Sequence, residues 1–304
     1  MAVINHRPDF YCNAFGSGEP ALRIRHGDTV STSTVDAHGY DGRMEAAAGR
    51  VNPLTGPFFV EGAEEGDTLA VRLDRLSPNR GSGWTRMSLA PNVVDPDFVP
   101  RLGERDYLEW AIDLSGWTAT LNDPKAPDLR LAFPLAPMLG CIGVAPEGGQ
   151  IITTMTSGPY GGNMDYVGCK EGATLCFPVF AKGALLYVGD GHAVQGDGEI
   201  IGTGVETSFD VQFTVSVLKG KSIRWPRGED RSRIFTLGNA RPLDQALQHA
   251  TTEMFIRLNE DYGFDSLASS LLLGCAVKYE IGNVFDPAYT VACILPKDRL
   301  KRGK

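Results

Sequence analysis

Hydrophobic and polar residues alternate along several stretches in the first two-thirds of the chain. The clearest stretch spans Ser208 to Leu218, where every second residue from Phe209 to Val217 is Phe or Val and the residues between are polar. Residues 68–73 and 108–114 show the same alternation. Because successive side chains of a strand point to opposite faces, this period predicts half-buried antiparallel strands. Turns rich in Gly, Pro and Asp separate them, which favours a β-sandwich or a jelly-roll-like barrel.

The pattern changes near residue 241. Apolar residues recur at helical spacing from Leu243 to Leu258, with Pro242 suited to the first turn and Gly263 to the position after the end. A second helix is predicted over residues 265–277, and a strand over residues 289–295. The sequence therefore predicts a mainly β fold with an α+β C-terminal part.

Composition narrows the class of protein. The chain has 304 residues, 42% of them hydrophobic and 22% charged, with a net charge of −8. These values are typical of a globular protein, and the acidic balance argues against a nucleic-acid partner. The one dense basic run is residues 297–304. Three portions are expected: a β-sandwich portion over 1–140, a β-rich segment with glycine-rich loops over 141–218, and an α+β portion over 219–304.

Targeting and redox signals favour a cytoplasmic protein without a membrane partner. The first residues lack the basic and apolar regions of a signal peptide. The longest nearly apolar run, residues 267–277, is far shorter than the ~20 residues of a membrane span. Six cysteines occur without a CxxC pair, which predicts free and mostly buried thiols.

Glycine is unusually frequent. The chain has 36 glycines in 304 residues, or about 12%, whereas the usual share is ~7%. The run Gly189–Gly204 holds six glycines in sixteen residues, together with Asp190, His192, Gln195 and Glu199. Asp190 and His192 are two residues apart and share a face of an extended segment. An imidazole with carboxylates in a short span suits a divalent ion. A solvated Gly-Asp hairpin with an incidental histidine explains the same pattern.

Two further glycine-rich clusters carry carboxylates. One spans residues 157–165 and ends in Asp165, and the other spans residues 35–42 and holds Asp36 and His38 at the same two-residue spacing. The common catalytic signatures GxSxG, HExxH and GxGxxG are absent, and the P-loop-like ending at 219–222 lacks its first glycine.

The chain resembles the acetamidase/formamidase family. The segments that carry the resemblance are residues 27–37, 52–67, 140–146, 161–165 and 177–199, with a looser match over 279–297. The resemblance implies a β-rich, jelly-roll-like fold with an α/β portion, hydrolysis of a short linear amide, a divalent metal and an oligomer. The chain departs from the family pattern after Asp36, where His38 and Tyr40 replace residues of a Phe-Gly-Gly-Gln-like stretch.

The resemblance also implies which residues form the site. Asp165, Asp190, His192, Gln195 and Glu199 match the family's polar site, and Asp36 and Glu61 come from its N-terminal motifs. The expected metal ligands are His192, Asp165 and Asp36. The expected catalytic residues are Glu199, Asp190 and Glu61. The expected substrate contacts are Gly161 and Gly162 through backbone amides, Gln195, His38 and Tyr40.

The sequence thus predicts a metal-dependent amidohydrolase that converts a short amide into ammonia and a carboxylate. Zinc is the expected metal, with calcium as the alternative, and a homodimer or higher homo-oligomer is expected. Three alternatives stay open: a shifted substrate such as a cyclic or larger amide, a nitrilase-like thiol enzyme using Cys169, and a non-catalytic, metal-stabilised module that binds a small ligand.

Overall fold

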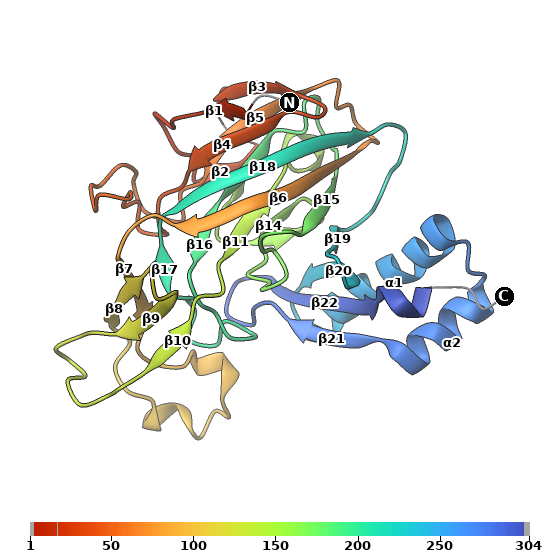
Figure 1. Cartoon of the computed structure of the whole chain (residues 1–304). Helices are drawn as coiled ribbons and strands as arrows, with labels where there is room; N and C mark the ends of the chain where they lie inside the picture. Colours follow the sequence, from red (N-terminus) through yellow and green to blue (C-terminus); the bar gives the residue numbers. More distant parts are fainter. Residues whose placement is uncertain (1–2, 17, 301–304) are drawn as a thin grey trace.

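Two large β-sheets pack face to face in the computed structural model, which describes residues 3–16 and 18–300 (Figure 1). The contact between them is direct, because Phe58 of one sheet and Phe213 of the other pack edge to face with centroids 5.2 Å apart. The predicted β-sandwich-like fold with an α+β C-terminal part is confirmed.

Within the described residues, the first sheet has nine strands, in the order β1 (Val3–Asn5), β4 (Thr29–Ser33), β18 (Phe209–Leu218), β6 (Thr68–Pro78), β15 (Thr174–Pro178), β19 (Arg227–Glu229), β20 (Arg233–Ala240), β22 (Tyr289–Pro296) and β21 (Lys278–Ile281). The second sheet runs in the order β10 (Ala132–Pro134), β9 (Thr118–Leu121), β8 (Tyr107–Asp113), β7 (Ser82–Arg86), β17 (Glu206–Thr207), β16 (Leu186–His192), β11 (Met138–Gly143), β14 (Gly161–Asn163) and β13 (Ser157–Gly158). Strand β5 (Thr55–Glu61) also pairs with β16, and β3 (Leu22–Arg25) pairs with β5. Strands β2 (Ala14–Phe15) and β12 (Ile152–Thr153) form a small separate sheet.

The predicted alternation is confirmed in β18. Every second side chain from Phe209 to Val217 is buried, and the residues between them are exposed or half-buried. The predicted strands at 68–73 and 108–114 appear as β6 and β8. Both sheets contain strands from the first two predicted portions, and in the first sheet β18 lies between β4 and β6. The boundaries at 140 and 218 stay predictions.

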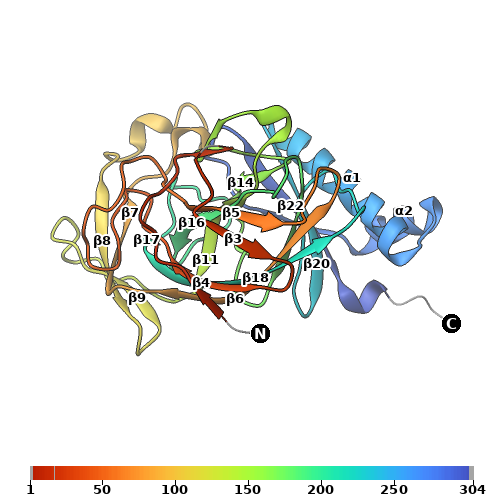
Figure 2. The same ribbon diagram turned by 90° about the horizontal axis from the view of Figure 1, so that it is seen from above.

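The helices gather at one end of the molecule, opposite the hairpins β7 to β10 (Figures 1 and 2). The predicted helices are confirmed as α1 (Leu243–Tyr262), which packs on β20 and β22, and α2 (Ser266–Ala276). Gly263 ends α1 in the left-handed conformation (φ 64°), and Asp265 caps α2 by accepting the Ala268 N–H. The short 3-10 helices are η1 (Pro91–Val93), η2 (Val99–Arg101), η3 (Glu147–Gly149) and η4 (Lys297–Leu300).

The predictions on cysteines, membrane-spanning helices and the basic run can be compared with the structure. Cys141, Cys169, Cys176, Cys275 and Cys293 are free thiols, and Cys12, Cys141, Cys169 and Cys293 are buried, as predicted. Across residues 3–16 and 18–300, no helix combines the length and apolar character that crossing a membrane requires. The basic run at 297–304 begins as η4, while residues 301–304, like 1–2, lie outside the described part.

Strand β16 positions the site, and it extends four residues further than the apolar stretch 184–188 predicts. A Cβ at Gly189 would lie 2.5 Å from Leu54 Cδ2, and a Cβ at Gly191 would overlap the Phe209 ring. Glycine therefore lets the strand press against the core on this face. Asp190 and His192 both reach a buried polar cluster.

Candidate active site

A buried imidazole faces two carboxylates where β16 pairs with β17. His192 stands opposite Glu206 in the register of the two strands, and opposite side chains of an antiparallel pair lie close together. The His192 Nε2 atom lies 2.9 Å from Glu206 Oε1 and 3.5 Å from Asp190 Oδ1. All three side chains are at most 4% exposed.

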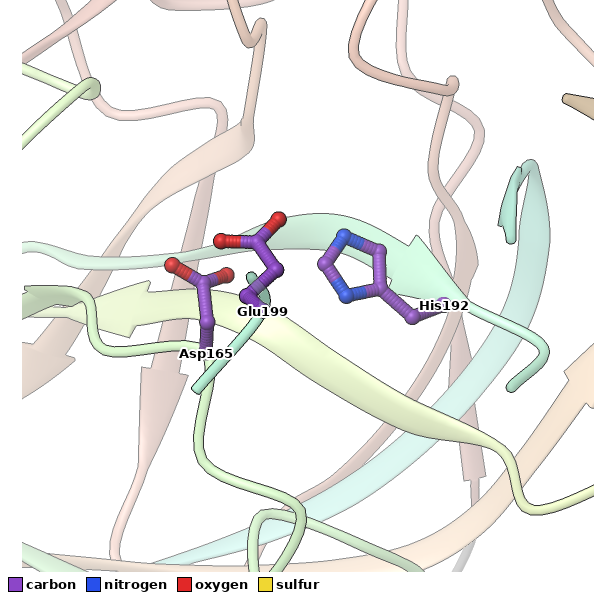
Figure 3. Close-up of side chains that lie close together, drawn as sticks. All are labelled: Asp165, His192 and Glu199. Carbon is purple, nitrogen blue, oxygen red and sulfur yellow. The ribbon is translucent and has the colours of Figure 1, made fainter. Parts of the chain in front are cut away.

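Two more carboxylates reach the same imidazole from loops. Asp165 follows β14, and Glu199 lies in the turn after β16. One ligand atom from each of Asp165, His192 and Glu199 lies within 4.8 Å of the others, and the same holds for Asp190, His192 and Glu206. Figure 3 shows the first of these groups converging from three segments of the chain. His192 therefore belongs to both groups.

Amide side chains and a fifth carboxylate complete the cluster. Asn52 Nδ2 donates to Asn163 Oδ1 at 2.8 Å and to Asp190 Oδ2 at 3.2 Å. Asn163 Nδ2 in turn donates to Asp286 Oδ2 at 2.5 Å. Asp190 and Asp286 are therefore each fixed by a segment distant in the sequence.

The backbone at the cluster is strained. Asn52, Asp165, Asp190 and Glu199 have left-handed φ angles of 41°, 46°, 59° and 47°. Side chains other than glycine adopt this conformation at a cost of about 1–3 kcal/mol each, and such residues gather at functional sites. The surrounding sheets hold the four residues in place.

The cluster is rich in negative charge. Burial raises the pKa of Glu206 to about 7 and that of Asp286 to about 7. Burial and the neighbouring carboxylates raise the pKa values of Asp165 and Glu199 well above their usual range. Burial alone lowers the pKa of His192, but its two facing carboxylates outweigh burial and raise it well above the usual value. No lysine or arginine in the described residues forms an ion pair with these carboxylates, so protons or a cation must balance their charge.

Gln195 fixes the orientation of the imidazole. The Gln195 Nε2 atom donates to the carbonyl oxygens of Asp165 at 2.6 Å and Gly282 at 3.3 Å. Gln195 Oε1 therefore faces His192 Nδ1, 2.7 Å away, and accepts its proton in a hydrogen bond. In the neutral ring Nε2 then carries the lone pair, as in a metal-binding histidine held by an outer partner.

The site fits a divalent cation. Asp165 Oδ1 and Glu206 Oε2 are buried and make no hydrogen bond to any described residue, and His192 Nε2 faces only carboxylate oxygens. Two ligand atoms at ~2.0–2.2 Å from one ion lie roughly 3.0–3.5 Å apart, which is close to the separations of 2.9 and 3.5 Å around Nε2. A Cβ at Gly140 would overlap Asp165 Oδ1 and lie 2.7 Å from Asp190 Oδ2. Glycine at this position keeps the space between the oxygens open.

A pocket of about 110 Å³ opens onto the cluster. Asp190, Glu199 and Glu206 line its buried end, and Trp84 and Tyr107 line both this pocket and an adjoining outer groove of about 470 Å³. Water takes up ~30 Å³ per molecule in the liquid, so the inner pocket holds a molecule of only a few heavy atoms.

The sequence profile of the acetamidase/formamidase family matches residues 143–301, just over half of the chain. The chain belongs to the acetamidase/formamidase family. The match contains His192 and all five carboxylates of the cluster. The resemblance inferred from the sequence is confirmed.

Solved structures and a curated sequence similar to this chain are also named as acetamidases or formamidases. The acetamidase of Yersinia enterocolitica superposes with a TM-score of 0.85 at 29% identity, covering 99% of this chain and 94% of that one. A predicted acetamidase/formamidase of Thermoanaerobacter tengcongensis gives 0.82 at 31% identity, covering 98% of both. A Schizosaccharomyces pombe protein named as a formamidase is 24% identical over 254 residues, or 66% of this chain. The chain spans 62% of the length of that curated relative.

Five of the residues that the family resemblance singled out do come together. Asp165, Asp190, His192 and Glu199 form the cluster, and the two-residue spacing of Asp190 and His192 brings both into it. Gln195, expected to contact substrate, instead holds the His192 ring. Its role is to position the imidazole.

The structure corrects the prediction of Asp36 as a metal ligand. Asp36 Oδ1 accepts the backbone N–H groups of His38 and Tyr40, each at 3.0 Å. Its Oδ2 accepts Arg80 Nη2 at 2.6 Å and Trp84 Nε1 at 3.1 Å. Because these four donors saturate both oxygens, Asp36 has no lone pair left for a cation. It anchors the loop that carries His38.

Breaking this buried ion pair is expected to destabilise the fold. Arg80→Met leaves the Asp36 carboxylate buried without its partner, and such changes cost about 3–5 kcal/mol. Guanidinium unfolding, followed by tryptophan fluorescence, measures the loss. Arg25→Met is the matched control, because its ion pair with Glu61 is 76% and 42% exposed and water screens exposed pairs. Equal effects of the two substitutions would contradict the role given to Asp36.

His38 contributes its side chain near the mouth of the pocket, whereas Tyr40 contributes its backbone. The His38 ring stacks on Trp84 with centroids 3.8 Å apart, packs edge-on against Tyr107, and lines the pocket. Its contact with substrate stays a prediction. Tyr40 contributes its backbone, since its carbonyl accepts Arg80 Nη1 at 3.3 Å, and its side chain is not among the described residues that line the pocket.

The structure does not bring Glu61 to the cluster, so its predicted catalytic role is wrong. Glu61 ends β5 at the surface, paired with Arg25 at 2.8 Å. The other end of β5, at Thr55, faces Val188 near the cluster. Six residues of extended chain separate Glu61 from Thr55, which is about 20 Å.

Gly161 and Gly162 lie where neighbouring segments of the backbone pack closely. Both lie in β14, between β11 and β13. A Cβ at either residue would lie 2.5 Å from a carbonyl oxygen of a neighbouring segment, and neither residue lines the pocket in the part of the chain that is described. These glycines allow close packing of the backbone, and their contact with substrate stays a prediction.

Sequence reasoning missed several members of the site. Glu206 faces His192 from a strand of only two residues. Asp286 lies in a C-terminal segment to which no role was assigned. Asn52 opens a motif that was used only for the resemblance, and Gly140 stands in another.

Proposed function

We propose that this chain hydrolyses the carbon–nitrogen bond of a short linear amide, releasing ammonia and a carboxylate, at a site that holds a divalent cation. The observation that carries the proposal is the buried His192 Nε2 atom, 2.9 Å from Glu206 Oε1 and 3.5 Å from Asp190 Oδ1, beside a pocket of about 110 Å³ that both carboxylates line. Membership of the acetamidase/formamidase family and two solved relatives described as acetamidases or formamidases support the reaction class.

His192 Nε2, Asp190 and Glu206 would hold the cation, because the oxygens of these two carboxylates lie nearest to that nitrogen. Bound there, a divalent cation polarises the amide carbonyl and lowers the pKa of water. One imidazole with carboxylates favours zinc, and a purely oxygen-rich arrangement around the same space favours calcium. We therefore propose zinc, with calcium as the alternative.

Glu199 carries out the proton transfers that the hydrolysis requires. Its carboxylate lines the pocket and lies in the group with His192 and Asp165. From this position Glu199 takes a proton from the attacking water and passes it to the departing nitrogen, which leaves as ammonia. Trp84 and Tyr107 line both the inner pocket and the outer groove, so the acyl group of a bound amide would lie against these two rings.

Metal removal tests the proposal. Ammonia release from formamide, acetamide and propionamide is measured alongside the metal content of the purified protein. Dialysis against a chelator is expected to abolish ammonia release and to lower the melting temperature, because a ligand that binds only the native state stabilises it. Adding back zinc or calcium should restore both.

Other outcomes separate the alternatives. Activity that resists the chelator but not a thiol reagent would favour chemistry at Cys169, although this side chain is 0% exposed. Metal and amide binding without ammonia release would indicate a non-catalytic binding protein. Sedimentation of the same preparation tests the proposed homo-oligomer.

A further inference from the structure

Three arginines lie near the mouth of the pocket without an acidic partner. Arg86 lines the inner pocket, Arg50 lines the outer groove, and Arg105 lies beside Arg86. None of the three takes part in an ion pair among residues 3–16 and 18–300. Arginines of this chain that fix structure, such as Arg80 and Arg227, do have buried carboxylate partners.

Arg86 is held in place by rings rather than by charges. Its guanidinium carbon lies 5.2 Å from the centre of the Tyr107 ring and 5.9 Å from that of Phe285. The Nε atom of Arg86 is buried and makes no hydrogen bond to any described residue. A buried donor without an acceptor costs free energy unless a ligand supplies one. The two rings therefore hold the Arg86 side chain beside the pocket, and its Nε atom is a donor for which the described residues supply no acceptor.

A second cation stands against the same ring. The guanidinium carbon of Arg105 lies 5.6 Å from the centre of the Phe285 ring, which Arg86 also approaches. Burial and the charge of Arg86 lower the pKa of Arg105. The fold thus keeps two like charges together at the pocket, an arrangement that an anion stabilises. A guanidinium binds a carboxylate through two parallel hydrogen bonds.

We propose that the amide which this pocket accepts carries a carboxylate on its other end, and that Arg86 binds this carboxylate. The inference rests on the proposed amidase function. The inner pocket of about 110 Å³ takes the amide group, and the outer groove of about 470 Å³, which shares Trp84 and Tyr107, leaves room for the rest of the molecule.

The substrate class is a monoamide of a short dicarboxylic acid. Water adds across the carbon–nitrogen bond, so the hydroxyl stays on the carbonyl carbon, the nitrogen leaves with the proton as ammonia, and the product is a dicarboxylate. A neutral amide such as acetamide leaves the donors of Arg86 unpaired. Selection by an unpaired buried polar group is strong, because the wrong substrate cannot satisfy it.

The comparison of malonamate with malonamide tests this inference. The two molecules have the same shape, but malonamate carries a carboxylate where malonamide carries a second amide. From initial rates of ammonia release, we expect kcat/KM for malonamate to exceed that for malonamide at least about tenfold. The preference should shrink as salt is added, because ions screen the attraction to the arginines.

Substitutions assign the preference to a residue. Arg86→Met should lower the ratio of the two kcat/KM values at least about tenfold, and Arg86→Lys should recover part of it. Arg101→Met is the matched control, because Arg101 is an exposed arginine over Phe98 and does not line the pocket. Competitive inhibition by malonate, the dicarboxylate product, should weaken in parallel in the Arg86 variants.

The outcomes separate this inference from the function on which it rests. A wild-type protein without preference for malonamate overturns it. So does an Arg86→Met variant that slows both substrates equally, which would mean that Arg86 only balances the charge of the cluster. Absence of ammonia from every amide, acetamide and formamide included, counts against the amidase function itself. If the Arg86 variants do not fold, the wild-type ratio and its salt dependence decide.

Discussion

His192→Ala is expected to abolish binding of the proposed cation and to lower kcat/KM for amide hydrolysis on the order of a thousandfold. His192 is common to both groups of possible ligands, so its loss affects every arrangement of the cation. A cation acting as a Lewis acid contributes several kcal/mol to catalysis, and each 1.36 kcal/mol corresponds to a factor of ten in rate. Metal analysis and ammonia release on the same folded preparation measure both effects.

His249→Ala is the control for this substitution. His249 lies on α1, where its ring stacks on Trp225 with centroids 4.3 Å apart. It has no connection with the cluster, and its variant should keep metal and activity. An active, metal-loaded His192→Ala protein would falsify the assignment of this imidazole.

Gly140→Ala is expected to have an almost equally large effect, although it adds a single methyl group. Gly140 lies in β11, and its added Cβ would overlap Asp165 Oδ1 and lie 2.7 Å from Asp190 Oδ2. Both carboxylates are buried and cannot swing away, so the methyl group takes the space between them. We expect loss of the cation and a fall in activity of at least about a hundredfold, beyond the ~1–3 kcal/mol that overpacking costs in stability.

Gly196→Ala is the matched control. Gly196 lies in the glycine-rich run next to the site, and no heavy atom lies within 4 Å of its added Cβ. Isothermal titration of metal-free protein with zinc compares the two variants directly. Zinc binding by Gly140→Ala with wild-type affinity would show that the cation does not occupy the space in front of this glycine.

The sequence is informative where periodicity and spacing report burial. The alternation in residues 208–218 predicts β18 because one face of that strand meets the core. The two-residue spacing of Asp190 and His192 brings both side chains to the site on one strand. The family motifs add Asp165 and Glu199, which lie in loops and have no periodic signal.

The rest of the site depends on contacts that spacing does not encode. Glu206 is a ligand candidate because β17 pairs with β16, and a strand of two residues is too short to show a period. Asp36 looks like a ligand in sequence because the approach of Arg80, 44 residues later, is visible only in the fold. Glu61 belongs to the same motif as Asn52, but the extended strand β5 lies between them and places Glu61 away from the site.

The cluster draws its members from segments as far apart as Asn52 and Asp286. Its assembly therefore requires that strands from both ends of the chain are already docked, and contacts of such long sequence separation form slowly. The cation site can exist only when folding is nearly complete. The cation that we propose would therefore bind only after the two sheets and the C-terminal portion have paired in the correct register, and its binding would be the last step of folding.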